Sequence, residues 1–466
     1  MAAATPGAAV PGAGATGPGT AAGPVPASVP ASVAALGDLD PVALLAEIAD
    51  VGRAAGGGWS RLVHTDAELT LRDWFTEHAT RLGLDVETDR NGNLWAWWGA
   101  DLPGADEPGA VLQVGSHLDS VPAGGAYDGP LGVVSALAAV SRLRAEGFRP
   151  HRPVVVPVFA EEEGGRFGIA CAGSRLMTGA LDPARAGALA DPDGVTAADA
   201  ARRVGADPAA WGPDPVRVAR IGEAVELHVE QGHLPTSGGC RHGALGLAEA
   251  GAPLGLLTEI WPHGRWRFDL VGEGNHAGTT PLDRRTDPML ALAEGVLAAR
   301  RAAERHGVLA TVGKVRVDPG AVNAIPSAAT FWLDARGADP VAVDAAVAEV
   351  AAALGTAGVR ESWTPVTRFD AGLGARLAGP VRVALAAAGA PAGADGRPLL
   401  PSLPSGAGHD AGVLAEAGVP TAMLVVRNPS GISHAPGEHA EDDDARLGAA
   451  ALVEIIRDRA GSGWQG

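Results

Sequence analysis

The sequence has few cysteines and little positive charge. Two cysteines in 466 residues are too few for a disulfide framework or a four-cysteine zinc site. The formal net charge is −18, and Lys314 is the only lysine. Proteins that coat nucleic acid or an anionic membrane need a basic face, so this charge balance argues against both classes.

Signals for export and for membrane insertion are also missing. A signal peptide begins with a basic region, but the first Lys or Arg here is Arg53. No stretch offers the roughly 18 uninterrupted apolar residues that a transmembrane helix needs. We therefore expect a cytoplasmic protein. Residues 1–35 are almost entirely Ala, Pro, Gly, Val, Thr and Ser, and we predict that they form a disordered tail.

Alternating strand and helix patterns predict an α/β catalytic domain. Apolar runs at 111–114 and 154–160 flank residues 132–147, which have helical apolar spacing. Such alternation is typical of a mostly parallel central sheet, in which functional side chains gather at the carboxyl ends of the strands. The pattern returns near the C-terminus, with a helix, a strand and a closing helix expected at about 377–388, 421–426 and from 442.

A different pattern interrupts this alternation. Strands are expected at 266–270, 307–317 and 330–334, and helices at 287–305 and 339–354. We therefore predict a smaller α+β domain, residues 259–368, inserted into a catalytic domain formed by residues 36–258 and 369–466.

The first candidate metal ligand follows the apolar run that ends at Gly115. His117 lies two residues before Asp119, whose carboxylate could hold the other nitrogen of the imidazole. Asp128 stands eleven residues beyond His117, among glycines that let the backbone approach an ion closely. A lone His-x-Asp pair more often belongs to an ordinary surface loop, so this motif needs support from others.

Three consecutive glutamates, Glu161, Glu162 and Glu163, follow the next apolar run. On so acidic a protein they could form an exposed loop tip, but their place at the end of a core strand favours a functional site. Adjacent carboxylates repel one another unless cations are near. They also suit a division of labour, in which one binds metal and its neighbour acts as general base on a metal-bound water.

Two further histidines follow predicted strands, His228 in ELHVEQG and His434 in GISHAPGE. Together with His117, Asp128 and one glutamate they form a ligand set for two divalent cations. A shared aspartate would bridge the ions, which would lie about 3.5–4 Å apart. Carboxylate and imidazole ligands suit Zn, Mn, Co or Ni.

A series of motifs runs in order from about residue 115 to 438: GSHLDSVPAGGAYDG, EEEGGRFG, ELHVEQG, EGNHAGTTP, AVNAIP, LDAR, PSGAGHDAG and GISHAPGE. In this set the sequence resembles the M20 metallopeptidase superfamily, specifically its amidohydrolase branch. That branch holds N-carbamoyl-L-amino-acid hydrolases, allantoate amidohydrolases and β-ureidopropionases.

The resemblance implies a role for each motif. One metal would be held by His117, Asp128 and His228, and the other by Asp128, Glu163 and His434. Glu162 would be the catalytic base, and Glu161 would be an acidic neighbour without direct metal contact. The insert corresponds to the family's lid and dimerisation domain. The implied substrate-binding residues are Gln231, Gly406, Ala407, His276, Asn323 and Arg336.

The chemistry of these residues agrees with the implied roles. Arg336 offers a bidentate fork for a substrate carboxylate, although without the family match a surface arginine would be the simpler interpretation. His276 could act in catalysis by stabilising an oxyanion. Main-chain N–H groups near Gly406 and Ala407 could face a substrate. The stretch Trp261-Pro262-His263 replaces a hinge that is usually small and contains glycine, so lid motion or substrate shape could differ.

We therefore expect a homodimeric amidohydrolase with two metal ions per subunit. It would hydrolyse the ureido bond of an N-carbamoyl-L-amino acid, a small molecule with a carboxylate, to the L-amino acid, CO2 and ammonia. The alternatives are allantoate amidohydrolase or β-ureidopropionase, then an M20 peptidase or aminoacylase. A non-catalytic binding scaffold is the alternative from another class, and ammonia release by metal-loaded protein distinguishes it.

Overall fold

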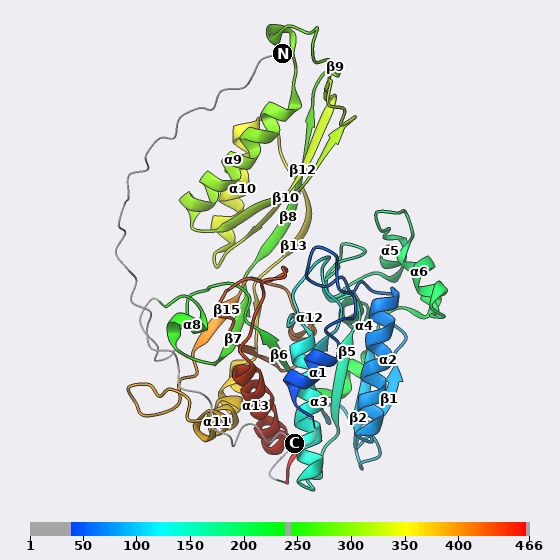
Figure 1. Ribbon diagram of the computed structural model, residues 1–466, viewed down its shortest axis with the longest axis vertical. Coiled ribbons are helices and arrows are strands. Elements are labelled where there is room, and N and C mark those ends of the chain that lie inside the picture. The colour runs from blue at the N-terminus through cyan, green and yellow to red at the C-terminus, as the bar shows by residue number, and fades with distance from the viewer. Residues whose placement is uncertain (1–38, 238–243, 463–466) are drawn as a thin grey trace, which may run out of the picture.

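The computed structural model describes residues 39–237 and 244–462 (Figure 1). The predicted tail, residues 1–35, lies outside the described residues. Within the described ranges, no helix is both long enough and apolar enough to cross a membrane.

A ten-stranded mixed sheet forms the centre of the larger part of the molecule, with strand order β1-β2-β5-β3-β6-β16-β7-β14. The short strands β4 and β15 pair with β5 and β7. Neighbours within the run β5-β3-β6-β16 are parallel, while β2 and β7 join that run in antiparallel orientation. The strands are β1 (Asp85–Thr88), β2 (Leu94–Trp98), β3 (Val111–Val114), β4 (Ser116–His117), β5 (Val154–Phe159), β6 (Ile221–Val229), β7 (Leu254–Ile260), β14 (Thr367–Arg368), β15 (Ser402–Ser405) and β16 (Thr421–Val426). The predicted mixed α/β fold with a mostly parallel centre is confirmed.

Helices cover both faces of this sheet, which is why its central strands are apolar throughout. All residues of β3, β5 and β16 are buried. Along β3, Leu112 and Val114 pack into a core cluster with α3 and α13, whereas Val111 packs into a second cluster with α4 and α12. The helices of this part are α1 (Pro41–Glu47), α2 (Asp66–Arg81), α3 (Pro130–Ala145), α4 (Ala172–Thr178), α5 (Pro183–Ala188), α6 (Ala197–Arg203), α7 (Pro215–Arg220), α8 (Gly246–Ala250), α11 (Ala371–Ala387), α12 (Asp410–Glu416) and α13 (Asp442–Ala460).

The chain order of the strands differs from their spatial order. β16 is the last strand of the described chain, yet it lies in the interior of the sheet between β6 and β7. Its residue Val425 is level with His228 on β6. The C-terminal segment therefore completes the sheet beside the strand that carries a candidate ligand.

A second sheet lies within the residues of the predicted insert. It has four antiparallel strands in the order β10-β12-β8-β13, and its buried residues pack against two helices. Phe268 and Phe331 stack on neighbouring strands with ring centroids 4.8 Å apart. These elements are β8 (His263–Val271), β10 (Leu309–Asp318), β12 (Ala328–Arg336), β13 (Val359–Thr364), α9 (Pro288–His306) and α10 (Pro340–Leu354), with a two-stranded ribbon of β9 (Asn275–His276) and β11 (Ala324–Ile325). Figure 1 shows this smaller unit above the larger one, with β9 at its far end.

Candidate metal centre

Three candidate ligands meet at one edge of the central sheet. His117 on β4, Asp128 in the loop before α3 and His228 near the end of β6 are all buried, and their possible ligand atoms lie within 4.8 Å of one another. Nε2 of His228 is 3.1 Å from Oδ1 of Asp128, and Nε2 of His117 is 3.6 Å from the same oxygen. Both imidazoles therefore face one oxygen of Asp128.

A second group uses the other oxygen of the same aspartate. Asp128, Glu163 and His434 also bring possible ligand atoms within 4.8 Å of one another. Nε2 of His434 is 3.1 Å from Oε2 of Glu163 and 3.5 Å from Oδ2 of Asp128. Asp128 thus presents one oxygen to each group, which is the geometry that a bridging carboxylate needs.

The two buried histidines are oriented as metal ligands are. Nδ1 of His228 lies 2.9 Å from the main-chain oxygen of Val229, and Nδ1 of His117 lies 3.2 Å from that of Asp119. A carbonyl oxygen can only accept, so Nδ1 of each ring is a donor, which leaves Nε2 as the ring nitrogen that a metal would take. Among the described residues neither Nε2 has a hydrogen-bond partner, although both are buried. A buried ring nitrogen without a partner is costly unless a ligand satisfies it, so the residues fit divalent cations.

Asp119 ties the first histidine to the glutamate loop. Its carboxylate accepts hydrogen bonds from the main-chain N–H groups of Glu162 and Glu163, at 3.2 and 3.1 Å. The same carboxylate lies 3.5 Å from Nδ1 of His117, slightly farther than the main-chain oxygen of Asp119. Asp119 therefore orients both the histidine and the loop.

Glu162 faces the first group without belonging to it. Its Oε2 is 3.7 Å from Nε2 of His117, but Glu162 is in none of the three groups of converging ligand atoms in the described chain. Burial raises the pKa of Glu162 well above its ordinary value, and the carboxylates of Asp410 and Glu163 add to the effect against the opposing charge of His117. A divalent cation nearby would be the largest local charge and would favour the proton-accepting form.

Asp128 is held from several sides. Gln231 Nε2 and Ser433 Oγ donate to its Oδ2 at 2.7 and 3.0 Å, and Glu438 accepts from its main-chain N–H at 2.9 Å. Burial by itself would raise the pKa of Asp128, but the three neighbouring histidines hold it well below its ordinary value. Asp128 is therefore ionised. Sequence reasoning missed Ser433 and Glu438, although both lie in the GISHAPGE motif that supplied His434.

Gly129 shows why glycine follows Asp128. Its φ is +82°, and a Cβ at this position would lie 2.3 Å from Cε1 of His117. Any other residue would force the imidazole to move. Pro130 then begins α3 at a position where its missing N–H costs nothing. The turn thus lets Asp128 and His117 share one small volume.

Arg336, at the end of β12, reaches across to the larger part. Its Nη1 donates to the main-chain oxygen of Gly406 at 2.5 Å, while Nε and Nη2 donate to the carboxylate of Asp334 at 2.7 and 2.6 Å. One edge of the guanidinium fork therefore already binds Asp334. This aspartate lies in the LDAR motif, but the sequence did not indicate its role. The N–H of Ala407 is used locally, because it donates to Ser405 Oγ at 3.0 Å.

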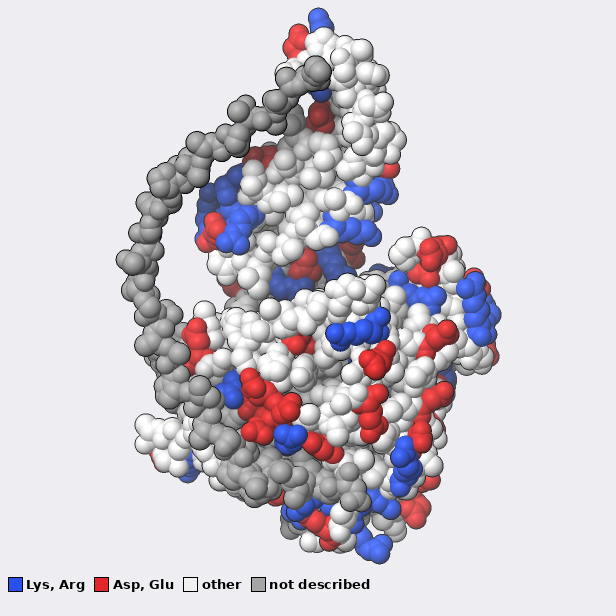
Figure 2. Space-filling view, viewed as in Figure 1, with Lys and Arg blue, Asp and Glu red and all other residues white. Residues whose placement is uncertain are grey.

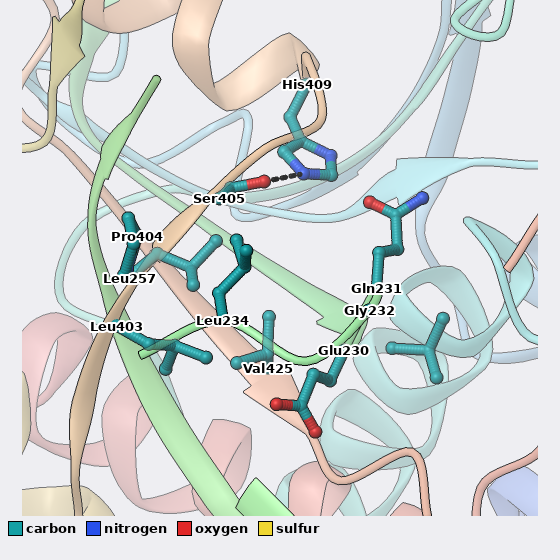
Figure 3. A pocket seen from close by; sticks show the side chains of 11 residues that line it. Glu230, Gln231, Gly232, Leu234, Leu257, Leu403, Pro404, Ser405, His409 and Val425 are labelled. Carbon is teal, nitrogen blue, oxygen red and sulfur yellow. Dashed lines mark hydrogen bonds between the residues drawn. The ribbon is translucent and has the colours of Figure 1, made fainter. Parts of the chain in front are cut away.

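A small cavity adjoins the first ligand group. Figure 3 shows Gln231 and His409 turned toward the same side of it, with Glu230 pointing away. The rings of His409 and His228 have centroids 4.8 Å apart, and Ser405 Oγ lies 3.2 Å from His409 Nε2. Burial and the nearby charge of His228 lower the pKa of His409 well below its ordinary value, so its ring is neutral.

His276 and Asn323 lie elsewhere. Both are exposed, and the N–H of Ala277 donates to the main-chain oxygen of Asn323 at 3.0 Å beside the β9–β11 ribbon. This ribbon is at the end of the smaller unit far from the larger one (Figure 1). The structure therefore does not bring these two residues to the candidate metal-ligand groups of their own chain.

Known proteins match nearly all of this chain. The family model described as Peptidase family M20/M25/M40 matches residues 114–458. The N-carbamoyl-L-amino acid amidohydrolase of Geobacillus stearothermophilus is 34% identical over 413 residues, which cover 88% of this chain and 96% of the relative. The allantoate amidohydrolase of Escherichia coli (strain K12) is 29% identical over 427 residues, which cover 90% and 96%.

Solved structures give the same result. The amidase of the hydantoinase/carbamoylase family from Burkholderia vietnamiensis superposes with a TM-score of 0.75 at 30% identity, covering 91% of this chain and 98% of that one. The relatives are hydrolases that act on C–N bonds, and so is this protein. With the family model covering residues 114–458, the chain belongs to peptidase family M20/M25/M40, among its amidohydrolases.

Proposed function

We propose that the protein hydrolyses N-carbamoyl-L-amino acids to the L-amino acid, CO2 and ammonia. The observation that carries the proposal is Asp128, which offers one oxygen to each of two converging ligand groups beside Glu162. Relatives named as N-carbamoyl-L-amino acid amidohydrolases, matched over nearly nine tenths of this chain, support the substrate class.

Enzymes of this family generally depend on divalent metal ions, and we propose two per chain. His117, Asp128 and His228 would hold one ion, and Asp128, Glu163 and His434 the other. Zn, Mn, Co and Ni all suit this donor set. When bound, the ions supply positive charge that polarises the substrate carbonyl and makes a water molecule more acidic.

The protein's own groups then carry the proton and hold the reactants. Glu162 accepts a proton from the attacking water at Oε2, water oxygen bonds to the carbamoyl carbon, and Glu162 returns the proton to the leaving nitrogen as the C–N bond breaks. Asp119 keeps the main chain of the glutamate loop in place through its two hydrogen bonds. Gln231 and Ser433 fix the orientation of Asp128.

A substrate panel tests the proposal. Ammonia release would be measured for N-carbamoyl-L-amino acids, allantoate, β-ureidopropionate and N-acyl amino acids, with each metal added back to metal-free protein. The highest kcat/KM is expected for an N-carbamoyl-L-amino acid. Allantoate amidohydrolase is the second candidate, because relatives so named match 90% of the chain, and a preference for allantoate would select it. No turnover of any compound would favour a binding scaffold.

Arg336 would bind the substrate carboxylate through the N–H groups of Nη1 and Nη2 that are not donated to Asp334 or Gly406. Arg336→Ala should raise KM and lower kcat/KM by about 30-fold or more, since a buried ionic contact is worth roughly 2–5 kcal/mol. Metal content should not change. Arg265→Ala is the control, because Arg265 also approaches Asp334, at 3.6 Å, but is 54% exposed. Unchanged KM and kcat in Arg336→Ala would remove Arg336 from the site.

We also propose that the smaller unit pairs two copies of the chain. Ten of the fourteen large exposed aliphatic residues of the described chain lie within residues 259–368, so this quarter of the sequence carries most of them. Its edge strand β10 is ten residues long and largely exposed. Figure 2 shows a broad uncharged stretch along this unit. Unpaired edges of this kind are usually covered, and a second copy would cover this one.

In such a dimer, His276 and Asn323 would contribute to the active site of the partner chain. Mixing Glu162→Gln and His276→Ala chains tests this directly. Random reassortment makes half of the dimers mixed. If His276 acts across the dimer, one of the two sites in each mixed dimer has both Glu162 and His276 intact, so about a quarter of wild-type activity should return. If His276 acts only in its own chain, or not in catalysis, the mixture will not recover activity above its parents. A mass of one 46.6 kDa chain in solution would reject the dimer itself.

A further inference from the structure

The two carboxylate oxygens of Glu162 have different neighbours. Oε2 lies 3.7 Å from Nε2 of His117, on the side of the ligand groups. Oε1 accepts a hydrogen bond from the Cys171 thiol, with Sγ 3.3 Å away. In the described part of the chain, this thiol is the one hydrogen-bond donor to the Glu162 carboxylate.

The main chain holds Cys171 against Glu162. The N–H of Cys171 donates to the main-chain oxygen of Glu162 at 2.6 Å, so the two residues are joined through backbone and side chain. Cys171 has a φ of +55°, in the left-handed region that residues other than glycine rarely adopt. Such strained positions persist only where surrounding contacts enforce them, and they cluster at functional sites. The residue is 1% exposed and directly precedes α4.

We propose that Cys171 is a positioning residue for Glu162, whose thiol holds Oε1 so that Oε2 points to the place of the attacking water. This inference rests on the proposed function, in which Glu162 is the general base. The thiol acts as a donor and does not attack the substrate. Burial raises the pKa of Cys171 well above its ordinary value, and the carboxylates of Glu162 and Asp410 raise it further.

Two substitutions separate the hydrogen bond from simple packing. Cys171→Ala removes the donor, and Cys171→Ser keeps a hydroxyl donor, while both lose the volume of the sulfur. We expect Cys171→Ala to lower kcat about five- to tenfold, as for the loss of one hydrogen bond, with KM and metal content unchanged. We expect Cys171→Ser to return kcat to within about twofold of wild type. An alanine variant with wild-type kcat, or equal losses in both variants, would overturn the proposal.

A double substitution gives a second readout. If Cys171 acts through Glu162, adding Cys171→Ala to Glu162→Gln should leave the residual kcat unchanged, because the base is already gone. A further loss of several-fold would assign Cys171 a different role and overturn the inference. Melting temperature and metal content, measured on all variants, show that each is folded and loaded.

The same variants distinguish failure of the inference from failure of the proposed function. An active Glu162→Gln variant would mean that Glu162 is not the base, so the proposed function and the inference would both fail. An inactive Glu162→Gln variant together with a fully active Cys171→Ala variant would leave the proposed function standing and reject the role of Cys171 alone.

Discussion

Glu162→Gln should remove nearly all turnover while the protein keeps its metal. Glutamine has the size of glutamate but cannot accept the proton from water, and general-base catalysis of this kind contributes about 10²–10⁴-fold to the rate. Metal should stay because Glu162 belongs to none of the three groups of converging ligand atoms among the described residues. Steady-state ammonia release measures kcat, and elemental analysis of the dialysed protein measures the metal.

Glu163→Gln is the matched control for this substitution. Its Oε2 lies 3.1 Å from Nε2 of His434, so the variant should lose metal from the second ligand group. The two variants therefore have different defects: Glu162→Gln lacks the proton acceptor, and Glu163→Gln lacks a metal ligand. Loss of metal from Glu162→Gln and its retention by Glu163→Gln would reverse the assignment.

Asp128→Ala should lose the metal of both groups and with it all measurable activity. The two oxygens of Asp128 approach His228 Nε2 at 3.1 Å and His434 Nε2 at 3.5 Å, so alanine removes one ligand from each group at once. Elemental analysis of the purified variant should give a metal-to-chain ratio near zero. One ion that stays tightly bound would contradict a bridging role.

Gln231→Ala provides the comparison for Asp128→Ala. Gln231 donates to Oδ2 of Asp128 at 2.7 Å but offers no ligand atom to either group. Loss of such a supporting contact typically weakens metal binding by about 10–100-fold. A titration with metal should therefore still saturate the Gln231→Ala variant, at higher concentration, while Asp128→Ala does not saturate.

The candidate ligands could be found from sequence because of how parallel strands are arranged. His228 lies near the end of β6, His117 follows β3, and the glutamates follow β5. These strands are neighbours whose carboxyl ends share one edge. A local motif at each strand end was enough to place three segments together. Helix α13 and strand β16 also begin where apolar patterns indicate, at Asp442 and Thr421.

The supporting contacts could not be found in this way. Glu438 accepts from the N–H of Asp128 across 310 residues of sequence, and that contact depends on the paths of two loops. The same holds for Cys171 and Glu162, which meet only because the loop between them folds back. The position of His276 depends on where the smaller unit lies, which local periodicity does not encode. Strand β2, with the apolar sequence LWAWW, has no alternation to mark it.

The place of β16 has a consequence for synthesis of the protein. Until the chain beyond residue 421 has left the ribosome, β6 and β7 each expose an apolar edge that β16 will later occupy. Pairing over such sequence separations is slow, and exposed edges of apolar strands invite aggregation. The nascent chain must therefore stay protected through translation of about nine tenths of its length, and truncation before β16 should yield insoluble protein rather than a smaller folded enzyme.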